Sequence, residues 1–233
     1  MVIDGLAGKK VVVTGAYGQL GTAVTEAFLA ADAHVGVLDM ATGPHVPFQG
    51  PVAMAPGVNL IDPSSARQGI DLLADRLGGI DTLVNVAGGF TWIPFQDSAL
   101  DDWTRLFAMN VQTAVNATKA ALPHVKGSSA GRIISIGASA AIKAGAGMGP
   151  YAASKAGVMR FTEALAEEVK ETGITVNAVL PSILDTPANR AEMPNTDPSI
   201  WVKTEDVADL ILFLASDRAA SITGALIPIT GRV

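Results

Sequence analysis

Thr14-Gly-Ala-Tyr-Gly-Gln-Leu-Gly21 follows an apolar run of strand length, Lys10–Thr14, and opens a helical stretch, Gly18–Ala31. Glycines at positions 15, 18 and 21 allow the backbone to turn tightly, to approach a pyrophosphate and to pack a helix closely on a strand. The first amides of the helix and its positive dipole end would face the phosphates. The order strand, glycine turn, helix therefore predicts a dinucleotide-binding unit at the start of the chain.

The rest of the chain continues the alternation of strands and helices. The strands are rich in valine and isoleucine without clean alternation, which is typical of a parallel sheet covered on both faces. We predict an α/β fold, a single doubly wound domain spanning residues 1–233, with a parallel sheet of about seven strands flanked by helices. The expected strands are Lys10–Thr14, His34–Asp39, Val52–Leu60, Ile80–Val86, Arg132–Gly137, Ile174–Leu180 and Ala225–Ile229. The expected helices are Gly18–Ala31, Pro63–Leu77, Leu100–Arg105, Ala108–Val125, Pro150–Thr172 and Glu205–Ala215.

One long connection, residues 181–202, contains four prolines and no helical period. A loop of this length in a compact domain is usually a lid or a binding loop. Since it follows a sheet strand, we expect a substrate loop; the alternative is a disordered insertion.

The composition of the chain argues against several classes of function. Charged residues make up only 16% of the chain and the net charge is −6, which argues against a nucleic-acid partner. The chain has no cysteine, and its three histidines show no metal-ligand spacing, so no metal site is expected. No run approaches the roughly 20 apolar residues that span a bilayer. We expect a cytoplasmic protein that does not bind membranes.

Asp39 ends the second strand and lies 18 residues after Gly21. A carboxylate there would accept hydrogen bonds from ribose hydroxyls and repel a 2′-phosphate. The following residues, Met40, Ala41 and Thr42, provide no cation for that phosphate. The sequence therefore favours NAD(H) over NADP(H), unless Asp39 is an ordinary loop carboxylate.

Tyr151 and Lys155 are four residues apart in Tyr-Ala-Ala-Ser-Lys. Positions i and i+4 share one face of a helix, and a nearby ammonium favours the phenolate and lowers the pKa of a tyrosine. A tyrosine with a lowered pKa exchanges protons with an alcohol or carbonyl near neutral pH. The alternative interpretation is the plain surface of a helix.

Together these motifs resemble the short-chain dehydrogenase/reductase family, over essentially the whole chain. The matching motifs are the glycine turn at 14–21, Asp39, Asn85-Val-Ala-Gly88, Asn110-Val, Ser139, Tyr151-x-x-x-Lys155 and Pro181-Ser-Ile-Leu-Asp-Thr186. The resemblance implies a Rossmann fold and hydride transfer between nicotinamide and a small alcohol or carbonyl. It also implies a homotetramer, or a homodimer, built through the helices 108–125 and 150–172.

The resemblance also assigns roles. Tyr151 would be the general acid/base, Lys155 would lower its pKa and hold the nicotinamide ribose, Ser139 would bind the substrate oxygen and Asn110 would support a proton relay. The residues implied at the cofactor are Gly15, Tyr17, Gly18, Gln19, Leu20, Gly21, Asp39, Asn59, Leu60, Asn85, Ala87, Gly88, Tyr151, Lys155, Pro181, Leu184 and Thr186.

The chain departs from the family pattern at three positions. Gln19 stands where chains of this length usually carry glycine, and Val86 replaces a second asparagine. The family serine usually lies 13 residues before the tyrosine, whereas Ser139 lies 12 before it (151 − 139), and Ala138 holds the usual position. The alternatives to Ser139 are Ser135 or no serine at all.

A narrower resemblance concerns the segment Leu184-Asp-Thr-Pro-Ala-Asn-Arg-Ala-Glu-Met-Pro194 with Ser199-Ile-Trp201, which is similar to dihydropteridine reductases and their bacterial relatives. Those enzymes reduce a quinonoid pterin with NADH and do not need the serine. Trp92 and Trp201 are candidates for a stacking wall over a flat substrate, or they fill packing gaps. A non-catalytic NAD-binding sensor is the alternative from a different functional class.

Overall fold

The computed structural model describes residues 5–233, which build one seven-stranded sheet in the order β3-β2-β1-β4-β5-β6-β7, with every pairing parallel. The predicted fold class is thereby confirmed. The strands are β1 (Lys10–Thr14), β2 (His34–Asp39), β3 (Val52–Pro56), β4 (Thr82–Asn85), β5 (Arg132–Ile136), β6 (Thr175–Pro181) and β7 (Leu226–Ile229).

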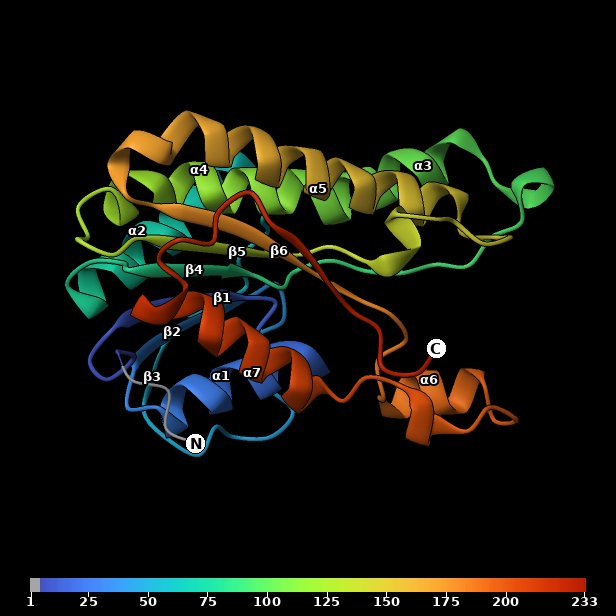
Figure 1. Cartoon of the computed structure of the whole chain (residues 1–233), viewed down its shortest axis with the longest axis horizontal. Coiled ribbons are helices and arrows are strands. Elements are labelled where there is room, and N and C mark those ends of the chain that lie inside the picture. The colour runs from blue at the N-terminus through green and yellow to red at the C-terminus, as the bar shows by residue number, and fades with distance from the viewer. Residues whose placement is uncertain (1–4) are drawn as a thin grey trace.

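Helices cover both faces of this sheet (Figure 1). α1 and α7 lie on one face, where Val24, Phe28 and Ile211 pack against the strands. α2, α4 and α5 lie on the other face, where Ile70, Ala121 and other residues form a second core layer. The helices are α1 (Gln19–Ala30), α2 (Pro63–Leu77), α3 (Leu100–Phe107), α4 (Thr113–Val125), α5 (Gly149–Val169), α6 (Pro187–Glu192) and α7 (Thr204–Ala215).

The strand order reverses between β1 and β4, which are neighbours in the sheet although β2 and β3 separate them in the chain. In doubly wound sheets the crevice beyond the carboxyl ends of such strands is where ligands bind. Thr14 and Asn85, the last residues of β1 and β4, are register partners at this crevice. The predicted glycine turn, Asn85 motif and Tyr151 helix all follow strands that end at this edge.

The structure differs from the predicted elements most at three places. β3 ends at Pro56 rather than at Leu60, because the chain turns at Gly57, which has φ +73°. The two predicted helices at 100–105 and 108–125 are joined by a π-helical segment, Ala108–Gln112. The 181–202 connection contains α6, so the prediction that it is irregular throughout is wrong.

α6 forms where local signals favour a helix. The Thr186 hydroxyl accepts a hydrogen bond from Asn189 N at 3.2 Å, and Pro187 occupies the first turn, where its missing N–H costs nothing. The base of the connection is closed by a parallel bridge between Leu184 and Val202. Figure 1 shows α6 set apart from the main body, at the end where β6 leaves the sheet.

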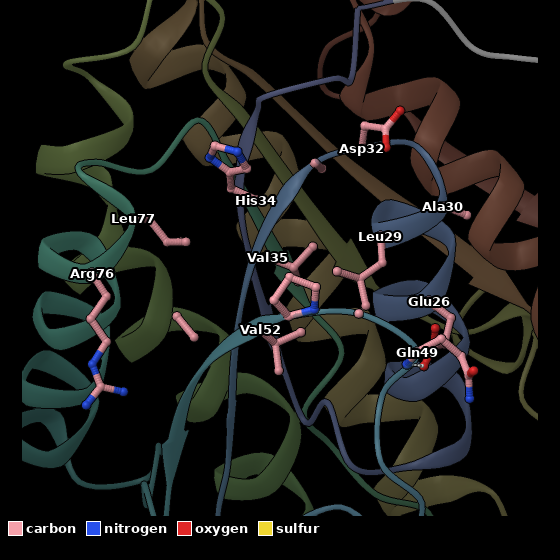
Figure 2. Close-up of a pocket in the computed structure, with 14 residues that line it drawn as sticks. Glu26, Leu29, Ala30, Asp32, His34, Val35, Gln49, Val52, Arg76 and Leu77 are labelled. Carbon is pink, nitrogen blue, oxygen red and sulfur yellow. Dashed lines mark hydrogen bonds between the residues drawn. The ribbon is translucent and has the colours of Figure 1, made fainter.

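The crossover from β2 to β3, residues 40–51, contains no helix. A hollow of about 850 Å³ lies beside it, between α1, the starts of β2 and β3 and the end of α2. Figure 2 shows the residues that line it. On one side the backbone N–H of Gln49 donates to Glu26 Oε1 at 2.9 Å, and on the other the Arg76 guanidinium donates to Met54 O at 2.7 Å. The hollow lies at the amino ends of the strands, opposite the predicted site.

Within residues 5–233, none of the helices combines the length and apolar character needed to cross a membrane.

Candidate active site

The three glycines of the turn differ in how much space a side chain would have. Gly15 has φ +62°, and a Cβ on it would lie 2.7 Å from Ala87 Cα. A Cβ on Gly21 would lie 2.1 Å from Gly15 O. A Cβ on Gly18 would make only one ordinary contact, 3.5 Å from Gly15 O. The fold therefore requires Gly15 and Gly21, whereas the space beside Gly18 is left open.

α1 begins directly after Gly18, and no side chain caps its first turn. Unpartnered amides at a helix start attract anions, and a phosphate can approach most closely where no side chain intervenes. The open position at Gly18 and the uncapped helix together fit the pyrophosphate of a dinucleotide.

Thr14 ties this turn to the segment after β4. Its Oγ1 accepts hydrogen bonds from Val86 N and Ala87 N, both at 3.1 Å. The contact brings the predicted cofactor residues Gly15 and Ala87 together. Thr14 is not among the predicted site residues, although its place at the end of a predicted strand and the start of the turn is a signal for this role.

Asp39 also holds the glycine turn. Its Oδ2 accepts from Tyr17 N at 3.0 Å, and its Oδ1 accepts from Ala41 N at 2.9 Å. Tyr17 is buried, and burial together with the Asp39 charge raises the pKa of its phenol. The carboxylate therefore stands at the carboxyl end of β2, fixed beside the turn that would hold the phosphates.

Asn59 and Leu60 lie between β3 and α2, near the carboxyl edge of the sheet. The Asn59 side chain accepts from Ile61 N at 3.0 Å, and Asn116 Nδ2 donates to Leu60 O at 2.9 Å. Leu60 is buried and Asn59 is exposed. The contact from Asn116 fastens the segment to α4.

Asn85 is buried at the end of β4. Its Nδ2 donates to Thr118 Oγ1 at 2.9 Å and to Ser135 Oγ at 3.3 Å. Ser135, the alternative serine, is completely buried in β5 and serves as an acceptor in this network.

Asn110 lies in the π-helical segment and binds the chain after β4. Its Oδ1 accepts from Gly89 N at 2.9 Å, and its Nδ2 donates to Gly89 O at 3.1 Å and to Ser154 Oγ at 2.9 Å. A Cβ on Gly88 would lie 2.5 Å from Asn110 Oδ1 and 3.4 Å from Lys155 Nζ. Asn110, Gly88 and Lys155 are thus in one small region; Ser154, which sequence reasoning missed, orients Asn110 from within the Tyr-Ala-Ala-Ser-Lys motif.

Tyr151 and Lys155 occupy successive turns of α5, as predicted. Lys155 is 5% exposed, and its Nζ donates to Ile136 O at 2.8 Å. Burial lowers the pKa of Lys155 to about 8 and raises the pKa of Tyr151 to about 12. The direction of the Tyr151 pKa is therefore opposite to the predicted one, because burial of the phenol disfavours its charged form.

Ser139 opens a short 3₁₀ turn, Ser139–Ala141, after β5. Its Oγ donates to Leu180 O at 2.9 Å. Ala138, at the usual serine position, is buried. The hydroxyl proton of Ser139 is thus directed to the backbone of β6.

The predicted residues of the 181–202 connection lie where β6 leaves the sheet. Pro181 is the last residue of β6, the Leu184 carbonyl accepts from Asn189 Nδ2 at 2.8 Å, and Thr186 caps α6. Asp185 forms a two-bond ion pair with Arg190, which lowers the pKa of its carboxyl.

The two candidate substrate residues differ in exposure. Trp92 is 56% exposed, and its Nε1 donates to Ala146 O at 2.9 Å. Trp201 is 4% exposed, and its Nε1 has no partner among the described residues. Phe90 lies close to the predicted general acid: its ring centroid is 4.9 Å from that of Tyr151, and the two rings are nearly perpendicular.

Comparison with known proteins agrees with this geometry. The family model described as short chain dehydrogenase matches residues 9–197. The chain is 31% identical over 235 residues to the 3-oxoacyl-(acyl-carrier-protein) reductase FabG of Salmonella typhimurium, covering 96% of each chain. It is 31% identical over 193 residues to the D-beta-hydroxybutyrate dehydrogenase of Rhizobium meliloti, covering 74% of this chain and 75% of that protein.

A solved structure shows the same architecture. A short chain dehydrogenase from Burkholderia cenocepacia, determined in complex with NADP, superimposes with a TM-score of 0.83 at 30% identity and covers 98% of both chains. The matched region of the family model contains the glycine turn, Asn110, Ser139, Tyr151 and Lys155. The chain belongs to the short-chain dehydrogenase family of nicotinamide-dependent oxidoreductases.

Proposed function

We propose that this protein is an NAD(H)-dependent oxidoreductase that interconverts a small alcohol and a carbonyl compound, with Tyr151 as general acid/base and Lys155 as its partner. The observation that carries the proposal is the pair itself. A phenol and a buried ammonium lie on successive turns of α5, beside Gly88 and Asn110, at the crevice edge of the sheet.

At neutral pH the protonation states suit donation of a proton to a carbonyl oxygen. With a pKa of about 12, Tyr151 keeps its proton and donates it to the substrate oxygen as that oxygen gains charge. With a pKa of about 8, Lys155 is mostly an ammonium at pH 7 and stabilises the phenolate that remains. Nicotinamide, when bound, supplies or accepts the hydride.

The other residues hold the reactants. Asn110 donates both hydrogens of its side-chain amide, one to Gly89 O and one to Ser154 Oγ. Its part in a proton relay would therefore be played by its backbone carbonyl, in the π-helical segment. The open space at Gly18 and the uncapped start of α1 would take the pyrophosphate. Leu184 and Thr186 would meet the carboxamide end of the cofactor.

The preference for NAD(H) rests on Asp39. Its carboxylate stands beside the glycine turn, and Met40, Ala41 and Thr42 add no positive charge. A 2′-phosphate would meet the negative charge of Asp39 without a compensating cation. NADP(H) is the alternative, since the related Burkholderia chain was solved with NADP.

A second candidate substrate is a quinonoid dihydropterin, reduced with NADH. It is favoured by Ser139, whose proton is directed to Leu180 O, because reduction of such a pterin needs no serine donor. The similarity of segment 184–201 to dihydropteridine reductases supports the same alternative. A sensor that binds NAD without turnover does not need a phenol and an ammonium arranged in this way.

One panel tests these proposals. NADH and NADPH oxidation is followed with quinonoid dihydropterin, aldehydes, ketones and diketones, together with fluorescence titration of NADH. Turnover of carbonyls with NADH supports the first proposal, and turnover of the pterin alone supports the second. NADH binding without turnover of any substrate would contradict both and leave the sensor.

We also propose assembly as a homotetramer, or a homodimer, through α4 and α5. The outward side of α5 carries Ala153, Ala156, Gly157 and Ala164, which permit close approach of a second helix. Phe107, 47% exposed, borders Gly157 on this surface. Light scattering after size-exclusion chromatography tests the assembly, and a monomer at micromolar concentration would contradict it.

A further inference from the structure

Exposed aromatic side chains follow the Asn85 motif, where the chain passes in front of α5. Phe90 is 46% exposed and Trp92 is 56% exposed. Both belong to the connection between β4 and α3; Phe90 contacts Tyr151, and Trp92 contacts Ala146 in the turn that precedes α5. Large apolar side chains left exposed at a site are commonly its binding surface.

Phe90 packs directly on the proposed general acid. The two ring centroids are 4.9 Å apart with an interplanar angle of 89°, an edge-to-face arrangement. The exposed part of the Phe90 ring therefore borders the place where the reacting group must meet the phenol.

Trp92 is fixed by the turn that precedes α5. Its indole N–H donates to Ala146 O, and Ile93 N donates to Gly147 O, each at 2.9 Å. Gly147 has φ +74°, and a Cβ on it would lie 2.3 Å from the indole ring. The ring therefore packs on bare backbone and keeps one orientation, so a ligand that stacks on it need not immobilise it.

Residues 86–99, the connection between β4 and α3, contain no lysine or arginine. Arg105, which donates to Thr91 Oγ1 in this connection, is already paired with Asp102, whose Oδ1 accepts from it at 3.2 Å. A carboxylate or phosphate bound beside Phe90 and Trp92 would have to compete with that pair, whereas a neutral ring meets exposed aromatic faces.

On the basis of the proposed function, we propose that the substrate of this site carries its carbonyl on a planar, uncharged aromatic group, and that Phe90 and Trp92 select it. Stacked or edge-on aromatic contacts contribute about 0.5–1.5 kcal/mol each beyond burial of area. Removing one ring should therefore lower the preference for an aromatic substrate roughly two- to tenfold.

The test compares benzaldehyde with cyclohexanecarbaldehyde, which have similar size but differ in planarity. We expect the wild type to show the higher kcat/KM for benzaldehyde, although conjugation makes its carbonyl the less reactive one. Phe90→Leu and Trp92→Leu should each lower the ratio of the two kcat/KM values. Trp92→Phe, which keeps a ring but loses the hydrogen bond to Ala146, should lower it less than Trp92→Leu.

Phe95→Leu is the matched control, because Phe95 lies in the same connection, is 83% exposed and has no aromatic contact with Tyr151. Unfolding temperatures establish that each variant is folded. An equal ratio in wild type, Phe90→Leu and Trp92→Leu would overturn the inference, as would a fall of the same size in Phe95→Leu.

Binding distinguishes failure of this inference from failure of the proposed function. Calorimetric titration with benzyl alcohol and cyclohexylmethanol measures selectivity without turnover. Tighter binding of benzyl alcohol, weakened in Trp92→Leu, supports the aromatic site even if neither aldehyde is reduced. Equal affinities would overturn it even if carbonyl reduction were demonstrated.

Discussion

The ammonium of Lys155 donates a hydrogen bond to the carbonyl oxygen of Ile136, 2.8 Å away at the end of β5. This bond places a buried cation between the last residue of a sheet strand and α5, the helix of Tyr151. The ammonium is costly to bury, which is why its pKa falls to about 8. Burying this charge therefore lowers the stability of the folded protein, by an amount that depends on pH.

Lys155→Met should change the pH dependence of stability as well as abolish turnover. Because the pKa of Lys155 is about 8 when folded and 10.5 in the unfolded chain, the unfolded state binds more protons between these values, and stability rises with pH there. The full difference corresponds to about 3 kcal/mol. Urea unfolding at pH 7.5, 8.5 and 9.5 should show a gain in the wild type that Lys155→Met lacks.

Tyr151 acts in the opposite direction at higher pH. Its pKa is raised from 10 to about 12, so the unfolded chain loses the proton first and stability falls above pH 10. The measurements on Lys155→Met are therefore confined to pH below 10. Parallel pH profiles for the two proteins would contradict the assignment of a buried, destabilised ammonium.

Ser139→Ala should have a small effect on catalysis. The serine proton is directed to Leu180 O, so we expect kcat to fall less than about threefold and stability to fall by roughly 1 kcal/mol, the usual contribution of one hydrogen bond. Steady-state kinetics and thermal unfolding check both. A loss of kcat of a hundredfold or more would show that the hydroxyl turns toward the substrate.

Gly18→Ala and Gly21→Ala should separate the cofactor from the fold. Since a Cβ at Gly18 meets only ordinary contacts, the first variant should remain folded, with at most about 1 kcal/mol lost at the helix cap, and bind NADH at least tenfold more weakly. A Cβ at Gly21 would lie 2.1 Å from Gly15 O, so the second variant should be strongly destabilised. Unchanged NADH affinity in Gly18→Ala would contradict a pyrophosphate at this turn.

Asp39→Asn combined with Met40→Arg should move the cofactor preference toward NADPH. The double variant removes a repelling charge and adds an exposed cation beside it, while the amide oxygen can still accept from the glycine turn. We expect the ratio of kcat/KM for NADH to that for NADPH to fall at least tenfold. Met40→Leu is the control, and a wild type that uses both cofactors equally would contradict the role of Asp39.

Much of the fold follows from local patterns. The bounds of β1, β2 and α2 agree with prediction, because β1 and β2 are valine-containing apolar runs and because Asp62 caps a helix whose first residue is Pro63. The order of the motifs along a doubly wound sheet also predicted which residues meet at its carboxyl edge.

All but one of the missed features depend on tertiary contacts. The π-helical segment at 108–112 places Asn110 against Gly89, which no periodicity within the segment indicates. The pKa of Tyr151 depends on how deeply α5 is buried, and the contact of Phe90 with Tyr151 depends on the path of a loop. α6 carried a local signal, Thr186 followed by Pro187, and was predictable from the cap alone.

The central claim, that Tyr151 exchanges the proton with substrate, is tested most directly by Tyr151→Phe. NADH oxidation with the best carbonyl substrate of the panel is measured together with NADH affinity by fluorescence. The account predicts that kcat falls by roughly 10²–10⁴, the usual contribution of a general acid, while NADH affinity changes less than about twofold. Turnover within threefold of the wild type at the same NADH affinity would contradict it.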